Sequence, residues 1–267
     1  MLKTRVLTAL LLLALFLLAL FYLPDNWWMV FIGAVILFAW DEWLRLTRLE
    51  SITARLAGAA LLCVLFIAIL WFRPLITWVV VTLLCLWLVL LIAAFIVSEG
   101  FLWSRTFRRL SGLIVLTLAW WMMGWLRAQW NGAWWVLGFL SIIWLADIGA
   151  YFVGRSFGKH KLAPSISPEK TIEGVIGGLA LVAIVTLVAQ RYYPVLPIIW
   201  LLPSTLLVAF VSVGGDLYES RLKRIEDIKD SGDILPGHGG ILDRIDSALV
   251  GLPVFVFVVL RMGLFSV

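Results

Sequence analysis

The sequence LITWVVVTLLCLWLVLLIAAFIV, residues 75–97, contains no charged residue and predicts a helix that spans a lipid bilayer. A hydrocarbon core about 30 Å thick requires about 20 apolar residues at a helical rise of ~1.5 Å each. Comparable apolar runs recur along the chain and predict nine spans, near residues 6–23, 27–40, 56–72, 75–97, 110–126, 133–152, 174–190, 195–213 and 247–266. The predicted fold is therefore an all-α, polytopic transmembrane helix bundle.

The composition of the whole chain supports this interpretation. Of the 267 residues, 63% are hydrophobic and only 14% are charged, and the mean hydropathy is +1.07. A soluble domain is nearer half apolar and a quarter charged, so an ordinary soluble globule is excluded, and so is a disordered chain. The first apolar run reaches Leu23 without a small-residue cleavage site, so we expect a retained helix, not a signal peptide.

Lysine and arginine are distributed unevenly between the two sides of the predicted bundle. If the N-terminus is cytoplasmic, 17 of the 21 basic residues fall on the cytoplasmic side and 4 on the other. Because cytoplasmic loops carry the excess of Lys and Arg, we predict that the N-terminus and segments 153–173 and 214–246 are cytoplasmic. The net charge of +5 then requires no nucleic-acid partner. Arg105 and Arg108 belong to this positive-inside set, and their removal is expected to cost little.

The polar residues divide the chain into two regions. Residues 1–109 are predicted to be N-terminal transmembrane helices, and residues 110–267 a catalytic region with polar segments 153–173 and 214–246. Of 16 acidic residues, eleven fall between positions 147 and 246, and eight of these lie in segment 214–246. Mixed charge is also typical of a solvated loop, but acids so close to a span are costly unless they are paired or bind a metal.

The spacing within segment 214–246 favours a site. If residues 214–227 are helical, Asp216, Ser220, Lys223 and Asp227 share one helical face. Asp243 and Asp246 are one helical turn apart and lead directly into the last apolar run.

These residue types suit one kind of chemistry. Carboxylates are the ligands that Mg²⁺ prefers, Lys and Arg neutralise phosphate oxygens, and a Gly-Gly turn at positions 239–240 exposes backbone amides to a phosphate. Segment 153–173 adds small residues, hydroxyls and bases. The sequence therefore predicts metal-assisted phosphoryl or nucleotidyl transfer at the cytoplasmic face. It contains no Walker loop, no His-Glu-x-x-His motif and no Gly-x-Ser-x-Gly motif.

Segment 214–246 also resembles a known signature, that of the phosphatidate cytidylyltransferases, or CDP-diacylglycerol synthases. The single-residue positions that match are Ser220, Lys223, Arg224, Lys229, Asp230, His238, Gly239, Gly240, Asp243, Arg244 and Asp246. The stretches 147–152, 167–174 and 214–216 are similar to the family as well. The resemblance covers about the C-terminal half of the chain.

The resemblance implies a reaction in which CTP and phosphatidic acid give CDP-diacylglycerol and pyrophosphate. It also implies Mg²⁺, with a monovalent cation such as K⁺ beside it, and a homodimer in the bacterial inner membrane. Asp216 and Asp243 resemble the two aspartates that bind the metal in this family. Asp246 is expected to be a further ligand or to support one. The remaining expected site residues are the phosphate-binding Lys223, Arg224, Lys229 and Arg244, and Ser167, Lys170, Thr171, Ser220, Asp230, Gly239 and Gly240 lining the substrate site. His238 either positions a phosphate or braces the turn.

Two other functions stay open at this point. A CTP-dependent kinase of a membrane alcohol would attack the γ-phosphorus of CTP and release CDP in place of pyrophosphate. A transporter would place its polar residues near the bilayer midplane, often in an internal repeat, and no repeat is visible. The role of Asp147, the acyl-chain preference, the choice between CTP and dCTP, the oligomeric state and the residue that recognises cytosine are left open by the sequence.

Overall fold

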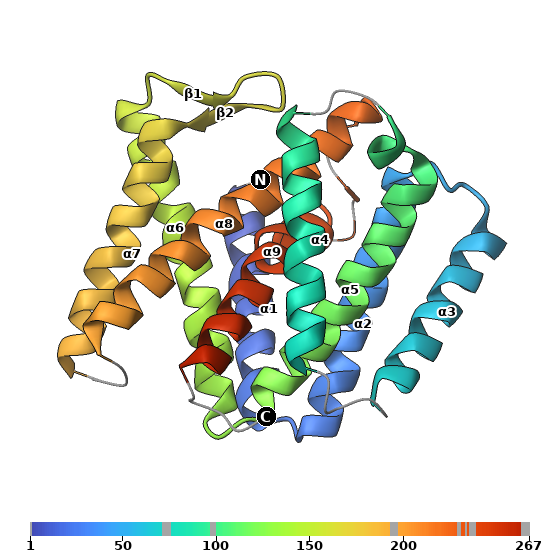
Figure 1. The fold of residues 1–267 in the computed structure, drawn as a ribbon, viewed down its shortest axis with the longest axis horizontal. Helices are drawn as coiled ribbons and strands as arrows, with labels where there is room; N and C mark the ends of the chain where they lie inside the picture. The colour runs from blue at the N-terminus through green and yellow to red at the C-terminus, as the bar shows by residue number, and fades with distance from the viewer. Residues whose placement is uncertain are drawn as a thin grey trace.

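A computed structural model describes residues 2–70, 76–96, 100–192, 197–228, 231–232, 234 and 239–262. Over these residues the chain is almost entirely helical, with one short β-hairpin (Figure 1). The elements are α1 (Leu2–Tyr22), α2 (Asp25–Leu46), α3 (Ile52–Leu70), α4 (Ile76–Ile96), the 3-10 turn η2 (Phe101–Trp103), α5 (Arg105–Arg127), α6 (Gly132–Phe157), β1 (Lys161–Ala163), β2 (Ser167–Thr171), α7 (Ile172–Tyr192), α8 (Ile198–Ile225) and α9 (Leu242–Arg261).

The all-α prediction is confirmed, and the membrane character is supported by helix length and composition. Within the described residues, five helices are long and apolar enough to cross a membrane, namely α3, α5, α6, α7 and α8. Helix α8 has 28 residues, which correspond to about 42 Å at ~1.5 Å per residue. This length exceeds a hydrocarbon core of about 30 Å, so α8 is long enough for one of its ends to extend beyond the apolar layer.

Several helix ends differ from those expected from hydropathy. Helix α6 continues to Phe157, and the remainder of segment 153–173 forms an antiparallel hairpin in which Lys161 pairs with Thr171 and Ala163 with Ser167. The helix considered for residues 214–227 is present as far as Ile225, as the last turns of α8. Asp227 lies beyond that helix in a left-handed conformation, with a φ of 54°. Hydropathy missed these ends because polar helical turns can continue past an apolar run.

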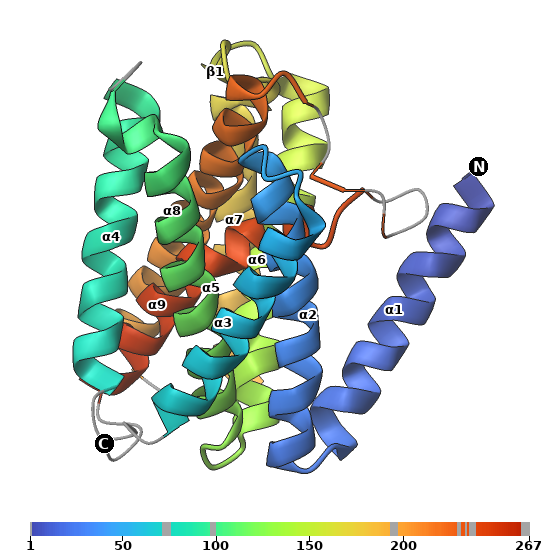
Figure 2. The ribbon, with the colours of Figure 1, turned by 90° about the vertical axis from the view of Figure 1, so that its right-hand side faces the viewer.

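Helix α9 occupies the centre of the bundle (Figures 1 and 2). It packs most extensively on α8 and also contacts α2, α4, α5 and α6, whereas α1 and α3 lie at the periphery. Position 109, where the two regions were divided, lies inside α5. Helices from both regions therefore contribute to a single hydrophobic core.

Helices α8 and α9 approach each other closely at Gly215. A Cβ atom at this position would overlap the carbonyl oxygen of Asp246 and crowd the side chain of Val250. Only glycine permits so short a distance between the two backbones. This close approach places Asp216, the next residue of α8, beside the first turns of α9.

Gly215→Ala is therefore expected to destabilise the protein by about 1–3 kcal/mol, the usual cost of overpacking, and to lower turnover. The measurements are thermal unfolding in detergent and the rate of product formation. Gly138→Ala in α6 is the matched control, because no atom lies within 4 Å of the added methyl group. Equal behaviour of the two variants would contradict the close-approach interpretation.

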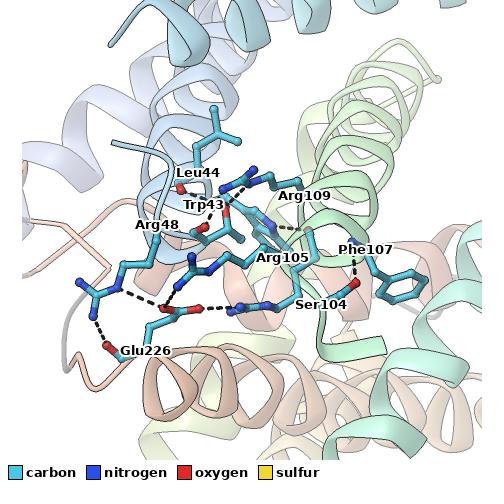
Figure 3. A network of polar contacts seen from close by, with 10 residues as sticks. Trp43, Leu44, Arg48, Ser104, Arg105, Phe107, Arg109 and Glu226 are labelled. Atoms are coloured by element: carbon cyan, nitrogen blue, oxygen red, sulfur yellow. Dashed lines mark hydrogen bonds and ion pairs between the residues drawn. The ribbon is translucent and has the colours of Figure 1, made fainter. Parts of the chain in front are cut away.

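The carboxyl end of α8 is fixed to the N-terminal helices by an ion-pair network around Glu226 (Figure 3). Arg108 of α5 binds one carboxylate oxygen of Glu226 at 2.5 Å, and Arg48 binds the other at 3.1 Å. The side chains of Arg108 and Glu226 are only 3% and 7% exposed. Arg108 is expected from the sequence to be a positive-inside charge whose removal costs little, but helical packing buries it against Glu226. Arg105, by contrast, is 59% exposed and lies 3.8 Å from Glu226.

Burial by itself would raise the pKa of the Glu226 carboxyl, but hydrogen bonds from Arg108 and Arg48 outweigh burial and hold this pKa below its usual value. The unfolded chain has a glutamate pKa of about 4.3. Because the folded pKa is lower, the stabilisation is present at neutral pH and is lost as the pH falls through the folded value.

Arg108→Ala is expected to lower the free energy of unfolding by about 3–5 kcal/mol, because it leaves a buried carboxylate without its principal partner. Arg105→Ala is expected to cost less than about 1 kcal/mol, as is usual for exposed pairs. Thermal unfolding of both variants at neutral pH measures this difference. Comparable losses would show that the network does not support the fold.

Candidate active site

A cavity of about 720 Å³ opens among helices α6, α7, α8 and α9 and strand β2. Its lining is apolar in one part and charged in another. The apolar part includes Leu140, Ile143, Trp144, Leu179 and Ala209, and the charged part includes Asp147, Arg155, Glu169, Lys170, Asp216, Asp243, Arg244 and Asp246. The volume falls within the range of ordinary small-molecule sites, about 300–1,000 Å³.

Asp216 lies at the centre of the charged part. The ammonium group of Lys170, on β2, lies 2.6 Å from its Oδ2 atom, and the hydroxyl of Ser220 donates to its Oδ1 atom at 3.2 Å. The negative charge of Asp216 also acts on Asp147 of α6 and on Asp246 of α9. Three carboxylates from three helices are thus held near one another, with Lys170 from the hairpin offsetting part of their repulsion.

A second group of polar contacts links α8 to the start of α9. Lys223 binds Oδ1 of Asp243 at 2.7 Å and lies 3.5 Å from Glu219. The other oxygen of Asp243 accepts hydrogen bonds from the backbone N–H groups of Gly240 at 2.9 Å and Ser231 at 3.2 Å. Asp243 therefore has partners on both oxygens, and its carboxylate fixes the turn that precedes α9.

Most of the residues predicted from the sequence lie in or beside this cavity. Lys170, Thr171, Asp216, Asp243, Arg244 and Asp246 line it, and Ser220 and Lys223 contact these residues. Thr171 has a structural contact as well, since its hydroxyl accepts the N–H of Gly174 at the start of α7. The packing of α8 on α9 brings Asp216 and Asp243 to one cavity.

The other predicted residues are placed differently. Arg224 donates to the carbonyl oxygen of Ile166 in the hairpin turn at 3.1 Å, and Ser167 pairs with Ala163 within the hairpin. Neither lines the cavity. Gly239 has a φ of 77° and, like Gly240, lies in the turn before α9. Lys229, Asp230 and His238 lie outside the described residues.

Sequence reasoning did not assign roles to two acids at this site. Asp147, left open above, lines the cavity, and the signal was its position in an apolar run. Glu219 is 2% exposed. It was detectable because it lies four residues before Lys223 and hence on the same helical face.

The donor set of the cavity suits Mg²⁺, although the described residues contain no group of three His, Cys, Asp or Glu side chains already arranged around an ion. Carboxylate oxygens are hard ligands, and Mg²⁺ commonly takes one or two of them and completes its shell with substrate phosphates and water. Asp216 and Asp246, facing one cavity from adjacent helices, meet that requirement. To bind the ion, Asp216 would have to exchange Lys170 for it, and Asp243 would have to exchange Lys223.

The fold and the cavity define the chain as an α-helical membrane protein with a cavity lined by carboxylates and basic side chains. Comparison with known proteins narrows this class. A model of the cytidylyltransferase family matches residues 3–262. The phosphatidate cytidylyltransferase of Pseudomonas aeruginosa is 43% identical over 263 residues, which cover 96% of each chain. The chain therefore belongs to the phosphatidate cytidylyltransferase family.

Two further relatives match over slightly less than half of the chain. The phosphatidate cytidylyltransferase of Bacillus subtilis is 50% identical over 126 residues, which cover 47% of this chain and 46% of the relative. That of Staphylococcus aureus is 53% identical over 113 residues, 42% of this chain and 44% of the relative. The resemblance recognised in the signature residues is confirmed, and the match to the family extends it into the N-terminal helices.

Asp216→Asn and Asp246→Asn are each expected to reduce turnover by at least 100-fold, because a neutral amide replaces the charge needed to hold a cation, at a cost of roughly 3 kcal/mol or more. The double variant should be little worse than either single one, since residues that act as a unit are strongly non-additive.

Asp227→Asn is the matched control. Asp227 is exposed, lies just past the end of the same helix and has a left-handed backbone that asparagine tolerates. Purified variants of equal thermal stability would be compared for product formation from labelled CTP. Loss of activity in Asp227→Asn equal to that in Asp216→Asn would contradict the assignment.

Proposed function

We propose that the protein transfers a cytidylyl group from CTP to phosphatidic acid, forming CDP-diacylglycerol and pyrophosphate. A phosphate oxygen of the lipid attacks the α-phosphorus of CTP. The bond between this phosphorus and the oxygen that bridges to the β-phosphorus breaks, and pyrophosphate leaves. Membership of the family and the name of the relative that matches 96% of the chain support this reaction.

The observation that carries the proposal is the two-part lining of the cavity. The lipid substrate has an anionic phosphate and apolar acyl chains, while CTP is anionic and water-borne. The charged part of the cavity, around Lys170, Asp216 and Arg244, suits the phosphates of both substrates. The apolar part, around Ile143 and Leu179, suits the beginning of an acyl chain.

The side chains have distinct roles in this proposal. Lys170 and Arg244 attract and orient phosphate oxygens by charge-assisted hydrogen bonds. Lys223 lies between Asp243 and the buried Glu219, and is placed to exchange a carboxylate for a phosphate. Asp216 and Asp246, with Asp243, are the candidate ligands for Mg²⁺ and an accompanying K⁺. When bound, a divalent cation reduces the repulsion between two anionic reactants and stabilises the developing charge.

The remaining features of the proposal concern placement in the cell. We place nine spans across the bacterial inner membrane, with the N-terminus and the active site at the cytoplasmic face, and expect a homodimer. The hairpin, the α2–α3 connection, the start of α5 and the end of α8 lie at one end of the bundle (Figure 2). Most of the basic residues belong to these segments, which agrees with the positive-inside rule.

The decisive experiment identifies the nucleotide product. Purified protein is given phosphatidic acid, Mg²⁺ and CTP labelled separately at the α- and γ-phosphates. We expect the α-label in the lipid and the γ-label in pyrophosphate, with both lost in EDTA. A γ-label in the lipid and free CDP would instead establish a CTP-dependent lipid kinase, and no turnover with any phosphorylated or hydroxylated lipid would favour a transporter.

A further inference from the structure

Glu42, on α2, makes contacts that its position in the sequence does not suggest. It lies near the carboxyl end of this helix and is only 1% exposed. One carboxylate oxygen accepts the backbone N–H of Ile241 at 3.0 Å. The other accepts the N–H of Leu242 at 2.7 Å and the hydroxyl of Ser231 at 3.3 Å. These donors are about 200 residues away in the chain.

Hydrogen-bond donors and two closely packed glycines surround the carboxyl group of Glu42. In the described residues no cation forms an ion pair with it, so hydrogen bonds must offset its desolvation. The first N–H groups of α9 supply both donors and the positive end of a helix dipole. Gly232 and Gly240 pack directly on the carboxylate, and a Cβ atom at either position would overlap it.

The segment that Glu42 binds is the one that holds Asp243. The N–H groups of Gly240 and Ser231 both donate to Oδ2 of Asp243, and Asp243 in turn binds Lys223. Ser231 therefore bonds to Glu42 through its hydroxyl and to Asp243 through its main chain. A shift of the Glu42 carboxylate would move the turn, Asp243 and the first residues of α9 together.

We infer that Glu42 is a positioning residue for the active site, which fixes the turn before α9 and through it the carboxylate of Asp243 and the ammonium group of Lys223. Glu42 is not among the residues that line the cavity. The expected effect of Glu42 on the reaction rate rests on the proposed function, whereas its expected effect on the turn does not. The inference also gives the N-terminal helices an indirect part in catalysis, although the signature lies entirely in the other half of the chain.

Glu42→Gln is the test variant. It keeps the size of the side chain, but its amide nitrogen faces a backbone N–H, so at least one hydrogen bond is lost. Loss of a charge-assisted hydrogen bond corresponds to a rate reduction of about 10- to 150-fold. We expect this reduction in kcat, with KM for CTP changed less than about threefold, because Lys170 lies on β2, away from the turn, and stays in place. Glu42→Asp, which keeps the charge, should be partly active.

Asp41→Asn is the matched control, since it removes one carboxylate charge from the neighbouring position on the same helix. Asp41 pairs with Arg45 and Arg55 at the surface and does not contact the turn. Its kcat should be that of the wild type.

Amide hydrogen exchange supplies a second readout that does not depend on activity. In Glu42→Gln, the amides of Ile241 and Leu242 should exchange at least tenfold faster, while those of α5 and α6 keep their wild-type protection. A uniform loss of protection in all helices would assign Glu42 a general structural role and overturn the inference. Exchange and kcat equal to those of Asp41→Asn would overturn it as well.

The two proposals can fail separately. If the wild type forms no CDP-diacylglycerol, the proposed function is wrong. The exchange measurement then still decides whether Glu42 holds the turn.

Discussion

The close contact between α8 and α9 is the feature on which the site depends. Gly215 lets the two backbones approach, and the carboxylates of Asp216 and Asp246 then face the same cavity. One and two helical turns further along α8, Glu219 and Lys223 meet the start of α9 at Asp243. Charged groups within an apolar bundle are stable only when they are paired, and here each helix provides partners for the other. The arrangement supplies both cations and carboxylates where phosphates would bind.

In the proposed function, the two-part lining of the cavity lets one site serve two dissimilar substrates. Helix α6 lines the apolar part with Ile143 and the charged part with Asp147, one helical turn apart. A lipid can therefore place its head group among the charges without leaving an apolar environment entirely. The hairpin brings Lys170 over the same region from outside the helices. A short hairpin has little core of its own, and the bonds of Lys170 to Asp216 and of Arg224 to Ile166 hold it against α8.

The N-terminal helices support the catalytic region at two buried carboxylates. Glu226, at the end of α8, is held by Arg48, just past the end of α2, and by Arg108 of α5. Glu42 of α2 is held by the first amides of α9. Each carboxylate has its hydrogen-bonding capacity met by a distant part of the chain. Because an unpaired buried charge is costly, these contacts strongly favour one arrangement of the helices. They also fix both ends of the segment between α8 and α9.

The sequence by itself determined the helical class, the approximate positions of the helices, the principal acids and bases, and the family. Apolar runs report directly on membrane helices, and the signature residues are close together in the chain, so a helical periodicity of 3.6 relates Asp216, Ser220 and Lys223. Only the tertiary structure decided the pairing of Lys170 with Asp216, the burial of Arg108, the hairpin within segment 153–173, and the bond from Glu42 to the turn before α9. Except for the hairpin, whose strand pairing is local, these features depend on contacts between residues up to 200 positions apart. Local periodicity carries no information about such contacts, because they are set by how whole helices pack.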